Sequence, residues 1–271
     1  MEESPSTKNI LGNIAKLITN DHQPLGCESW LTELSQSLLR TLEIIGSATF
    51  GMPLQTCISL SGMTSLSASL CQVTGCQPWV FQTILDITNL RVWKLGALAG
   101  GSLNVVELVN KASAINQGIQ HQHSIIEEDS VGAYNSDVLQ ITKAFAHAAE
   151  IFLHTTTSGA YPNVSDIGHA VSRVVRTIQR LDRPQLLESL AWPICVAASM
   201  ATEEHDSFFS GIANGARREG DYSVKLTRAL CVANECQRLR KSSLSTTVAR
   251  EGRAYDWFDA MRSLGKEWNL L

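Results

Sequence analysis

The chain has 271 residues, of which 44% are hydrophobic, and its formal net charge is −4. This composition is too apolar for a disordered chain and is sufficient for one large core. The 22 Lys and Arg residues are scattered along the sequence rather than gathered in one stripe. Because affinity for nucleic acid depends mostly on neutralising phosphates, we expect no direct DNA binding by this chain.

Cysteine usage and the first residues indicate the compartment. Seven cysteines occur, an odd number, and no two of them form a CxxC pair. Neither a disulfide framework nor a zinc module is therefore indicated, and we expect a reducing, cytoplasmic environment. Residues 1–24 open acidic and become amphipathic, unlike a secretion signal. The uncharged run 44–85 contains too many polar residues for a membrane span, so none is expected.

Helical periodicity recurs along the chain, whereas strand alternation is nearly absent. Residues 27–51 and 75–101 each predict one amphipathic helix, the second with Pro78 in its first turn. Ser102 is expected to be the N-cap of a third helix. Periodicity is then lost and charge gathers, so residues 120–136 are predicted to form an exposed loop.

The clearest helix is predicted from Asp137 to Gly159. Its apolar side carries four residues: Ile141, Phe145, Ala148 and Phe152. Its opposite side carries four polar residues: Lys143, His147, Glu150 and His154. A carboxylate between two imidazoles could hold a metal or tune a general base. Because these groups lie opposite the apolar side, a solvated or interdomain face is favoured instead.

Two further groups contain residue types that ligate metals. The predicted loop offers His121, His123, Glu127, Glu128 and Asp129. A metal could accept this set, but an exposed, irregular loop favours simple solvation. Cys231 and Cys236 are five positions apart on a predicted helix, which puts them on different flanks and favours core packing. We therefore expect no metal.

Residues 189–209 raise a separate question, because Pro193 lies inside an otherwise helical pattern. A proline there removes a backbone hydrogen bond and bends the helix. Small residues follow it and leave room beside the bend. That room could be a ligand pocket lined by Trp192, Cys195 and Ser199, or it could admit a neighbouring helix.

Three more helices are predicted, over residues 164–181, 223–243 and 256–271. No repeat of fixed period and no low-complexity linker separates the elements. The expected fold is therefore all-α, a single multi-helix domain over residues 25–271 that follows the amphipathic segment 1–24.

Three stretches together resemble a known family: "FLHTTTSGAYPNVSDIGHAVSRVVRTIQRL", "LLESLAWPICVAASMATEEHDSFF" and "YDWFDAMRSLG". They are similar to the fungal-specific transcription factor regulatory domain, the helical region of binuclear zinc-cluster regulators. The resemblance implies a helical fold with an apolar interior. The DNA reader of that family needs six closely spaced cysteines in a basic segment, whereas Cys27 stands alone in an acidic context. The resemblance is therefore to the regulatory region without its DNA-binding module.

Two functions remain open at this point. The first is catalytic: a helical domain whose apolar interior binds a hydrophobic biosynthetic intermediate and steers its cyclisation without a cofactor, by holding a reactive shape and donating hydrogen bonds. The residues expected to donate are His154, Tyr161 and Trp192, with Cys195 and Ser199 on the pocket wall. We favour this interpretation because the sequence has the pattern of a capped domain with no DNA reader.

The second function is regulatory. A transcriptional regulator or co-regulator of the same family would act through a partner that reads DNA, and would be nuclear rather than cytoplasmic. The basic cluster "RLRK" at residues 238–241 is a weak targeting signal.

The expected partners are a small hydrophobic metabolite and, as one option, a second copy of the chain in a homodimer.

Overall fold

The computed structural model describes residues 41–49, 74–129, 136–218, 224–245 and 254–265, with Leu39, Cys71 and Leu270. All regular structure within these ranges is helical and no strand occurs in them, which confirms the predicted all-α class. The predicted segment 1–24 and most of the predicted helix 27–51 lie outside the described residues, although 41–49 is helical.

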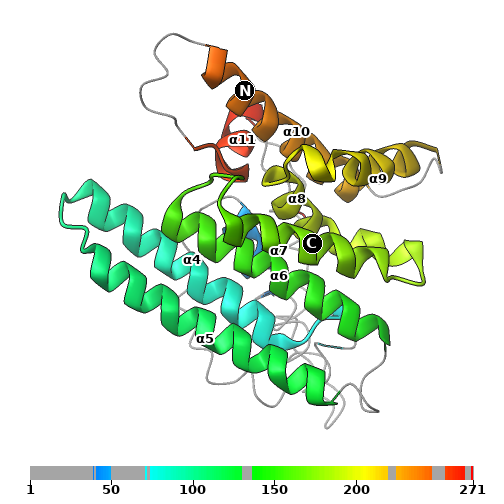
Figure 1. Ribbon diagram of the computed structural model, residues 1–271, viewed down its shortest axis with the longest axis horizontal. Helices are drawn as coiled ribbons and strands as arrows, with labels where there is room; N and C mark the ends of the chain where they lie inside the picture. The colour runs from blue at the N-terminus through cyan, green and yellow to red at the C-terminus, as the bar shows by residue number, and fades with distance from the viewer. Residues whose placement is uncertain are drawn as a thin grey trace, which may run out of the picture.

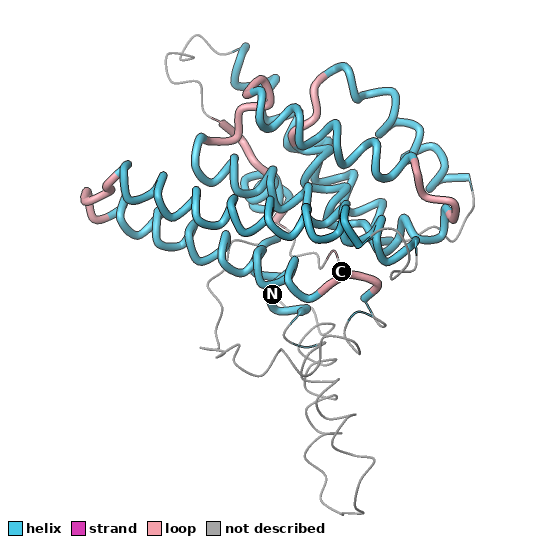
Figure 2. Tube along the Cα trace, turned by 60° about the horizontal axis from the view of Figure 1, so that its bottom comes forward, coloured by secondary structure: helices cyan, strands magenta, loops and turns pink. Residues whose placement is uncertain are grey.

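Eight longer helices and two short 3-10 helices follow residues 41–49 in the described part of the chain. The α-helices are α4 (Pro78–Ala99), α5 (Val105–Asp129), α6 (Ser136–Ser158), α7 (Ser165–Gln179), α8 (Ala191–Ser199), α9 (Asp206–Arg218), α10 (Val224–Ser245) and α11 (Trp257–Leu264). The 3-10 helices are η2 (Pro184–Leu190) and η3 (Glu203–His205). Short loops join most of these elements (Figure 2).

Helix α6 is the central element of the fold. It packs against α4, α5, α7 and α8. Helices α4 and α5 form a hairpin that runs along one side of α6, while α8, α10 and α11 gather at the other end of the molecule (Figure 1). This placement buries most of the α6 surface, including much of the polar side that the sequence favoured as a solvated face.

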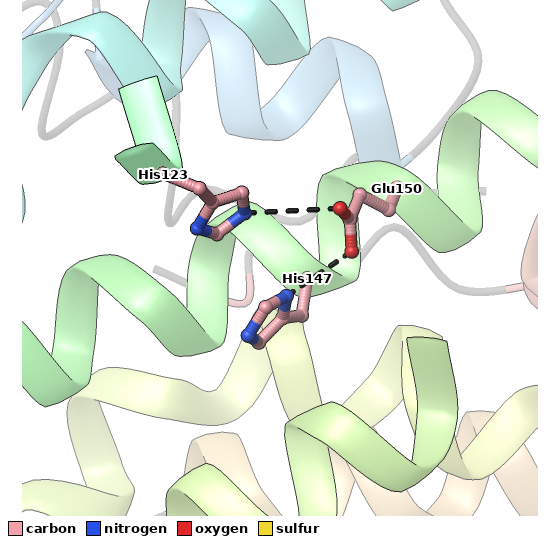
Figure 3. A group of neighbouring side chains, drawn as sticks. All are labelled: His123, His147 and Glu150. Atoms are coloured by element: carbon pink, nitrogen blue, oxygen red, sulfur yellow. Dashed lines mark hydrogen bonds and ion pairs between the residues drawn. The ribbon is translucent and has the colours of Figure 1, made fainter. Parts of the chain in front are cut away.

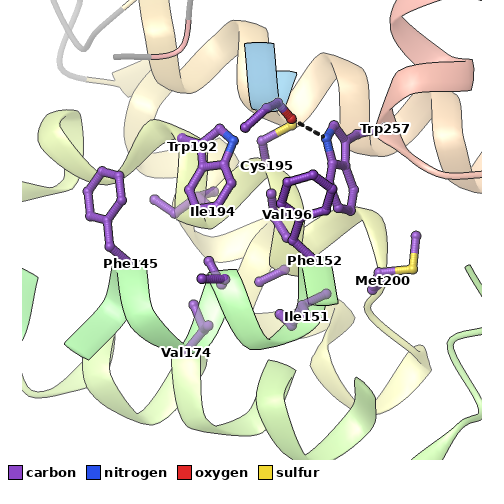
Figure 4. Close-up of a cluster of buried hydrophobic side chains, with 14 of the residues drawn as sticks. Phe145, Ile151, Phe152, Val174, Trp192, Ile194, Cys195, Val196, Met200 and Trp257 are labelled. Atoms are coloured by element: carbon purple, nitrogen blue, oxygen red, sulfur yellow. Dashed lines mark hydrogen bonds between the residues drawn. The ribbon is translucent and has the colours of Figure 1, made fainter. Parts of the chain in front are cut away.

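The apolar core is densest beside α8, where all nine residues are buried. The Trp192 ring stacks on Phe145 of α6, with ring centroids 5.8 Å apart. Trp257 of α11 is fully buried and packs edge-on against Phe152 at 5.5 Å. Its indole nitrogen donates to the carbonyl of Ala48 at 3.1 Å, which ties α11 to the helical residues 41–49 (Figure 4).

The predicted kink at Pro193 is wrong. Helix α8 begins at Ala191 after the 3-10 helix η2, so Pro193 is the third residue of a new helix. Backbone N–H groups in the first turn have no acceptor within their own helix, so a proline there interrupts no bond. The space beside α8 is occupied by helices, and Arg240 of α10 donates to the carbonyl of Ser199 at the end of α8.

The predicted N-cap of the third helix is wrong, and so is the first part of the predicted loop 120–136, whereas residues 130–135 lie outside the described residues. Asn104, not Ser102, caps α5: its side chain accepts a hydrogen bond from the backbone of Glu107 at 3.2 Å. The helix continues to Asp129, through the first half of the predicted loop 120–136. A sparse apolar stripe explains this length. Its buried members are Leu108, Ala112, Ile119 and Ile126.

None of the described helices is long and apolar enough to cross a membrane.

Candidate functional site

A buried carboxylate at the junction of three helices is the most polar feature of the described interior. Glu150, in the middle of α6, is only 2% exposed. His147 lies one turn before it on the same helix, and His123 reaches it from α5 (Figure 3). The donor atoms of these three side chains all lie within 4.8 Å of one another.

Each oxygen of Glu150 is contacted by donors from different helices. Oε2 accepts from His147 Nδ1 at 3.1 Å and from Arg173 of α7 at 2.6 Å. Oε1 accepts from Gln120 of α5 at 3.1 Å and lies 3.7 Å from His123 Nε2. A single carboxylate thereby joins α5, α6 and α7, because buried charges are stable only when paired and hydrogen-bonded.

The two imidazoles form a stack beside the carboxylate. Their ring centroids are 4.9 Å apart and their planes differ by 16°. The edge of Trp79 closes the other side of His123, with centroids 6.3 Å apart. The Nε2 atom of His123 is buried and makes no hydrogen bond. In the neutral tautomer that carries its proton on Nδ1, this nitrogen has a free lone pair.

The cluster shifts the protonation of two of its members. Burial, reinforced by the neighbouring His147, lowers the pKa of His123 to about 4. Burial alone would raise the pKa of Glu150, but the hydrogen bond and charge of His147 and the charge of Arg173 lower it to about 2. At neutral pH the cluster therefore contains a carboxylate and a neutral His123.

Only part of this cluster is predictable from local sequence patterns. Helical spacing places His147 and Glu150 on one face, as the structure does, but groups them with His154, which is not part of the cluster. Helices α5 and α7 pack against α6, so Glu150 on this face is buried, while Lys143, His147 and His154 are half-buried. The partner that was missed, His123, was assigned to an exposed loop. The signal that could have found it is the seven-residue spacing of Ile119 and Ile126, which predicts a helix on both sides of it.

The expected catalytic and pocket residues lie in different surroundings. Trp192, Cys195 and Ser199 are buried in α8, with exposed fractions of 0%, 1% and 0%. Tyr161, in contrast, is 46% exposed in the turn after α6, and His154 is half-buried. Burial raises the pKa of the Cys195 thiol above its usual range, so this cysteine is a neutral core residue. A role of these residues in binding a small molecule stays a prediction.

Comparison with known proteins identifies the family. The model of the fungal specific transcription factor domain matches residues 10–271. The chain belongs to this family. The match covers nearly the whole sequence and confirms the resemblance seen in its three helical stretches. No solved structure matches the chain.

Relatives of this fungal specific transcription factor domain include three named regulators. Transcription factor ntnD of Nectria sp is 33% identical over 54% of this chain and 27% of its own length. Transcription factor dibT of Pestalotiopsis microspora is 30% identical over 78% of this chain and 38% of its own. The ustiloxin B cluster transcription factor ustR of Aspergillus flavus is 28% identical over 71% and 34%. The chain thus spans about a quarter to two fifths of these relatives.

These comparisons correct the preferred functional interpretation. The expectation of a cofactor-free cyclase was wrong, as was the expectation that the chain is an enzyme, because the family and its named relatives are transcription factors. The cytoplasmic location expected with the enzyme has no support either. The physical reason for the error is that an apolar helical interior is the same whether it encloses a substrate or only its own side chains.

Proposed function

We propose that this chain is the regulatory domain of a fungal transcription regulator that controls a biosynthetic gene cluster. The observation that carries the proposal is the family match over residues 10–271. The relative ustR is named for the ustiloxin B cluster, which supports cluster control as the biological role. The regulator acts in the nucleus.

The arrangement of the interior supports a regulatory rather than a chemical role. The helix that was expected to line a pocket is buried on all sides, and its thiol is neutral. The basic residues are scattered along the sequence rather than gathered in one stripe, which does not favour binding to phosphates. We assign DNA reading to a segment or partner outside residues 1–271. A small hydrophobic metabolite as ligand and a homodimer stay predictions, which thermal shift and sedimentation measurements test.

A tethering experiment tests the proposed function. Residues 1–271 are fused to an unrelated DNA-binding domain, and transcription of a reporter that carries its binding site is measured in a fungal host. We expect a change of several-fold relative to the DNA-binding domain alone. A fusion with Trp257→Ala, which opens the core, should lose the change, whereas Trp93→Ala, at a partly exposed position, should keep it. A well-expressed fusion that leaves the reporter at the level of the DNA-binding domain alone would contradict the proposal.

A further inference from the structure

We propose that His123, His147 and Glu150 bind a zinc ion between α5 and α6 (Figure 3). The proposal rests on the geometry of these three residues and is independent of the regulatory role. It gives the domain a ligand-binding site of defined chemistry: two imidazoles and one carboxylate for a divalent transition metal.

The spacing of the donor atoms fits tetrahedral coordination. Zinc binds imidazole nitrogen and carboxylate oxygen at about 2.0–2.1 Å, so two ligand atoms of a tetrahedron are about 3.3 Å apart. His147 Nδ1 lies 3.1 Å from Glu150 Oε2, and His123 Nε2 lies 3.7 Å from Glu150 Oε1. Both distances are close to a tetrahedral edge, although they end on different oxygens of Glu150. One ligand atom from each of the three side chains lies within 4.8 Å of the other two, so coordination of one ion requires the three side chains to draw together.

The chemical state of the ligands also fits. A metal requires a neutral imidazole and an ionised carboxylate, and binding releases any proton that the ligand nitrogen holds. His123 Nε2 is buried and makes no hydrogen bond, so it can bind a metal without breaking a bond. His147 Nδ1 exchanges its hydrogen bond to Glu150 for the metal, and the neutral imidazole then carries its single proton on Nε2. Two imidazoles with a carboxylate suit zinc among the common divalent ions.

Arg173 is the competitor for this site. Its guanidinium occupies Glu150 Oε2 at 2.6 Å and neutralises the carboxylate in place of a metal. The Arg173 side chain is 36% exposed, so it can turn into solvent when the ion enters. Gln120 keeps its hydrogen bond to Glu150 Oε1 and orients the carboxylate, as outer partners of metal ligands do.

Exchange of Arg173 for a metal changes which helices the carboxylate joins. Without metal, the strongest contact of Glu150 ties α6 to α7 through Arg173. With metal, His123 becomes a direct ligand and the tie runs from α6 to α5. Three protein ligands also leave a fourth position for water or for an external group.

Titration of the metal-free full chain with Co²⁺, whose visible spectrum reports coordination, tests the proposal. The wild type should bind one equivalent with a four- or five-coordinate spectrum, and Zn²⁺ should displace it. His123→Gln and His147→Gln should each weaken binding by more than about 10-fold, the smallest loss typical even of outer partners. His154→Gln is the matched control, because it changes the same residue type on α6 outside the cluster, and it should bind as the wild type does.

Arg173→Gln provides a variant with the opposite expected sign. Removal of the competing guanidinium should tighten Co²⁺ binding several-fold. Circular dichroism checks that each variant is folded. If His123→Gln or His147→Gln does not fold, zinc X-ray absorption of the wild type decides: a nitrogen and oxygen shell supports the site. A sulfur shell from the cysteines, absence of binding by the wild type, or wild-type affinity in both folded histidine variants would overturn the proposal.

Discussion

Two parts of the interior are held together by different physical means. Beside α8 and α11, the core is aromatic and aliphatic: Trp192 stacks on Phe145, and Trp257 packs edge-on against Phe152. Between α5, α6 and α7, Glu150 collects hydrogen bonds from side chains of all three helices. The stability of the first region depends on close packing of side chains. The stability of the second depends on the hydrogen-bond partners that surround the charge of Glu150.

The difference predicts how each region responds to substitution. A truncated aromatic residue loses transfer free energy and leaves a cavity, and the loss increases with the volume removed. A substituted carboxylate changes little volume, but it leaves its donors without an acceptor. In the aromatic core, a polar substitution should therefore be strongly destabilising, and a small change in side-chain shape moderately so. In the Glu150 cluster, both the loss of the charge and a displacement of the carboxylate should be strongly destabilising.

The largest expected loss of stability comes from Trp257→Ala. The side chain is fully buried and its indole donates to Ala48, so the change removes both packing and a buried hydrogen bond. The free energy of unfolding should fall by about 3–5 kcal/mol in urea denaturation followed by circular dichroism. Trp93→Ala, at a partly exposed position, is the control and should cost less. Equal losses for the two variants would contradict the importance of this core.

The next loss is expected from Glu150→Gln. The amide nitrogen that replaces one oxygen faces the donors of Arg173 and His147, so the free energy of unfolding should fall by about 2–3 kcal/mol. The matched control is Glu107→Gln on α5, which removes an exposed pair with Lys111 and should cost less than about 0.5 kcal/mol. Similar values for both glutamates would show that the cluster does not stabilise the fold.

A smaller loss is expected from Asp256→Ala at the start of α11. The Asp256 side chain accepts from the backbone of Asp259 at 3.1 Å and completes a capping box. Its loss should cost about 1–2 kcal/mol of unfolding free energy. Asp166→Ala in the first turn of α7 is the control. The Asp166 charge interacts favourably with the helix dipole but no side-chain hydrogen bond caps this helix, so its loss should cost only a few tenths of a kcal/mol. Chemical denaturation of the two variants side by side checks the ranking.

The smallest expected effect is a pH dependence at Glu235 of α10. Hydrogen bonds from Arg238 and Ser263 lower the pKa of Glu235 to about 2, below its ordinary value of 4.5. A depressed carboxyl pKa stabilises the fold above about pH 4.5, and this contribution is lost as the pH falls toward 2. The melting temperatures of wild type and Glu235→Gln should therefore differ at pH 7 and converge below pH 3. A difference that stays constant with pH would contradict the assignment.

Local sequence patterns predicted those parts of the fold that local interactions determine. The apolar side of α6 follows directly from residue spacing, and Pro78 in the first turn of α4 was correctly placed. The cap at Asp256 was not predicted, although Asp256 and Asp259 are three residues apart, as a capping box requires. The prediction of a kink at Pro193 was wrong. The residues around a proline do not show whether it lies in the first turn of a helix or in the helix interior.

The candidate site could be predicted only in part, because it depends on contacts between distant residues. His147 and Glu150 are one helical turn apart and were found together. His123 comes from 27 residues upstream of Glu150 and Arg173 from 23 residues downstream, and no local pattern pairs them. The function was beyond local patterns as well, since the family match rather than any motif separated a regulator from an enzyme.

Transcript measurement after deletion of the gene in the source fungus is the direct test of cluster control by this protein. RNA is quantified for the biosynthetic genes that neighbour this gene, in the wild type, the deletion strain and a strain in which the wild-type gene is restored. We expect transcripts of a contiguous cluster to change several-fold on deletion and to return to the wild-type level on restoration. Cluster transcripts that stay at wild-type levels in the deletion strain, while the metabolite itself is lost, would contradict cluster control by this protein.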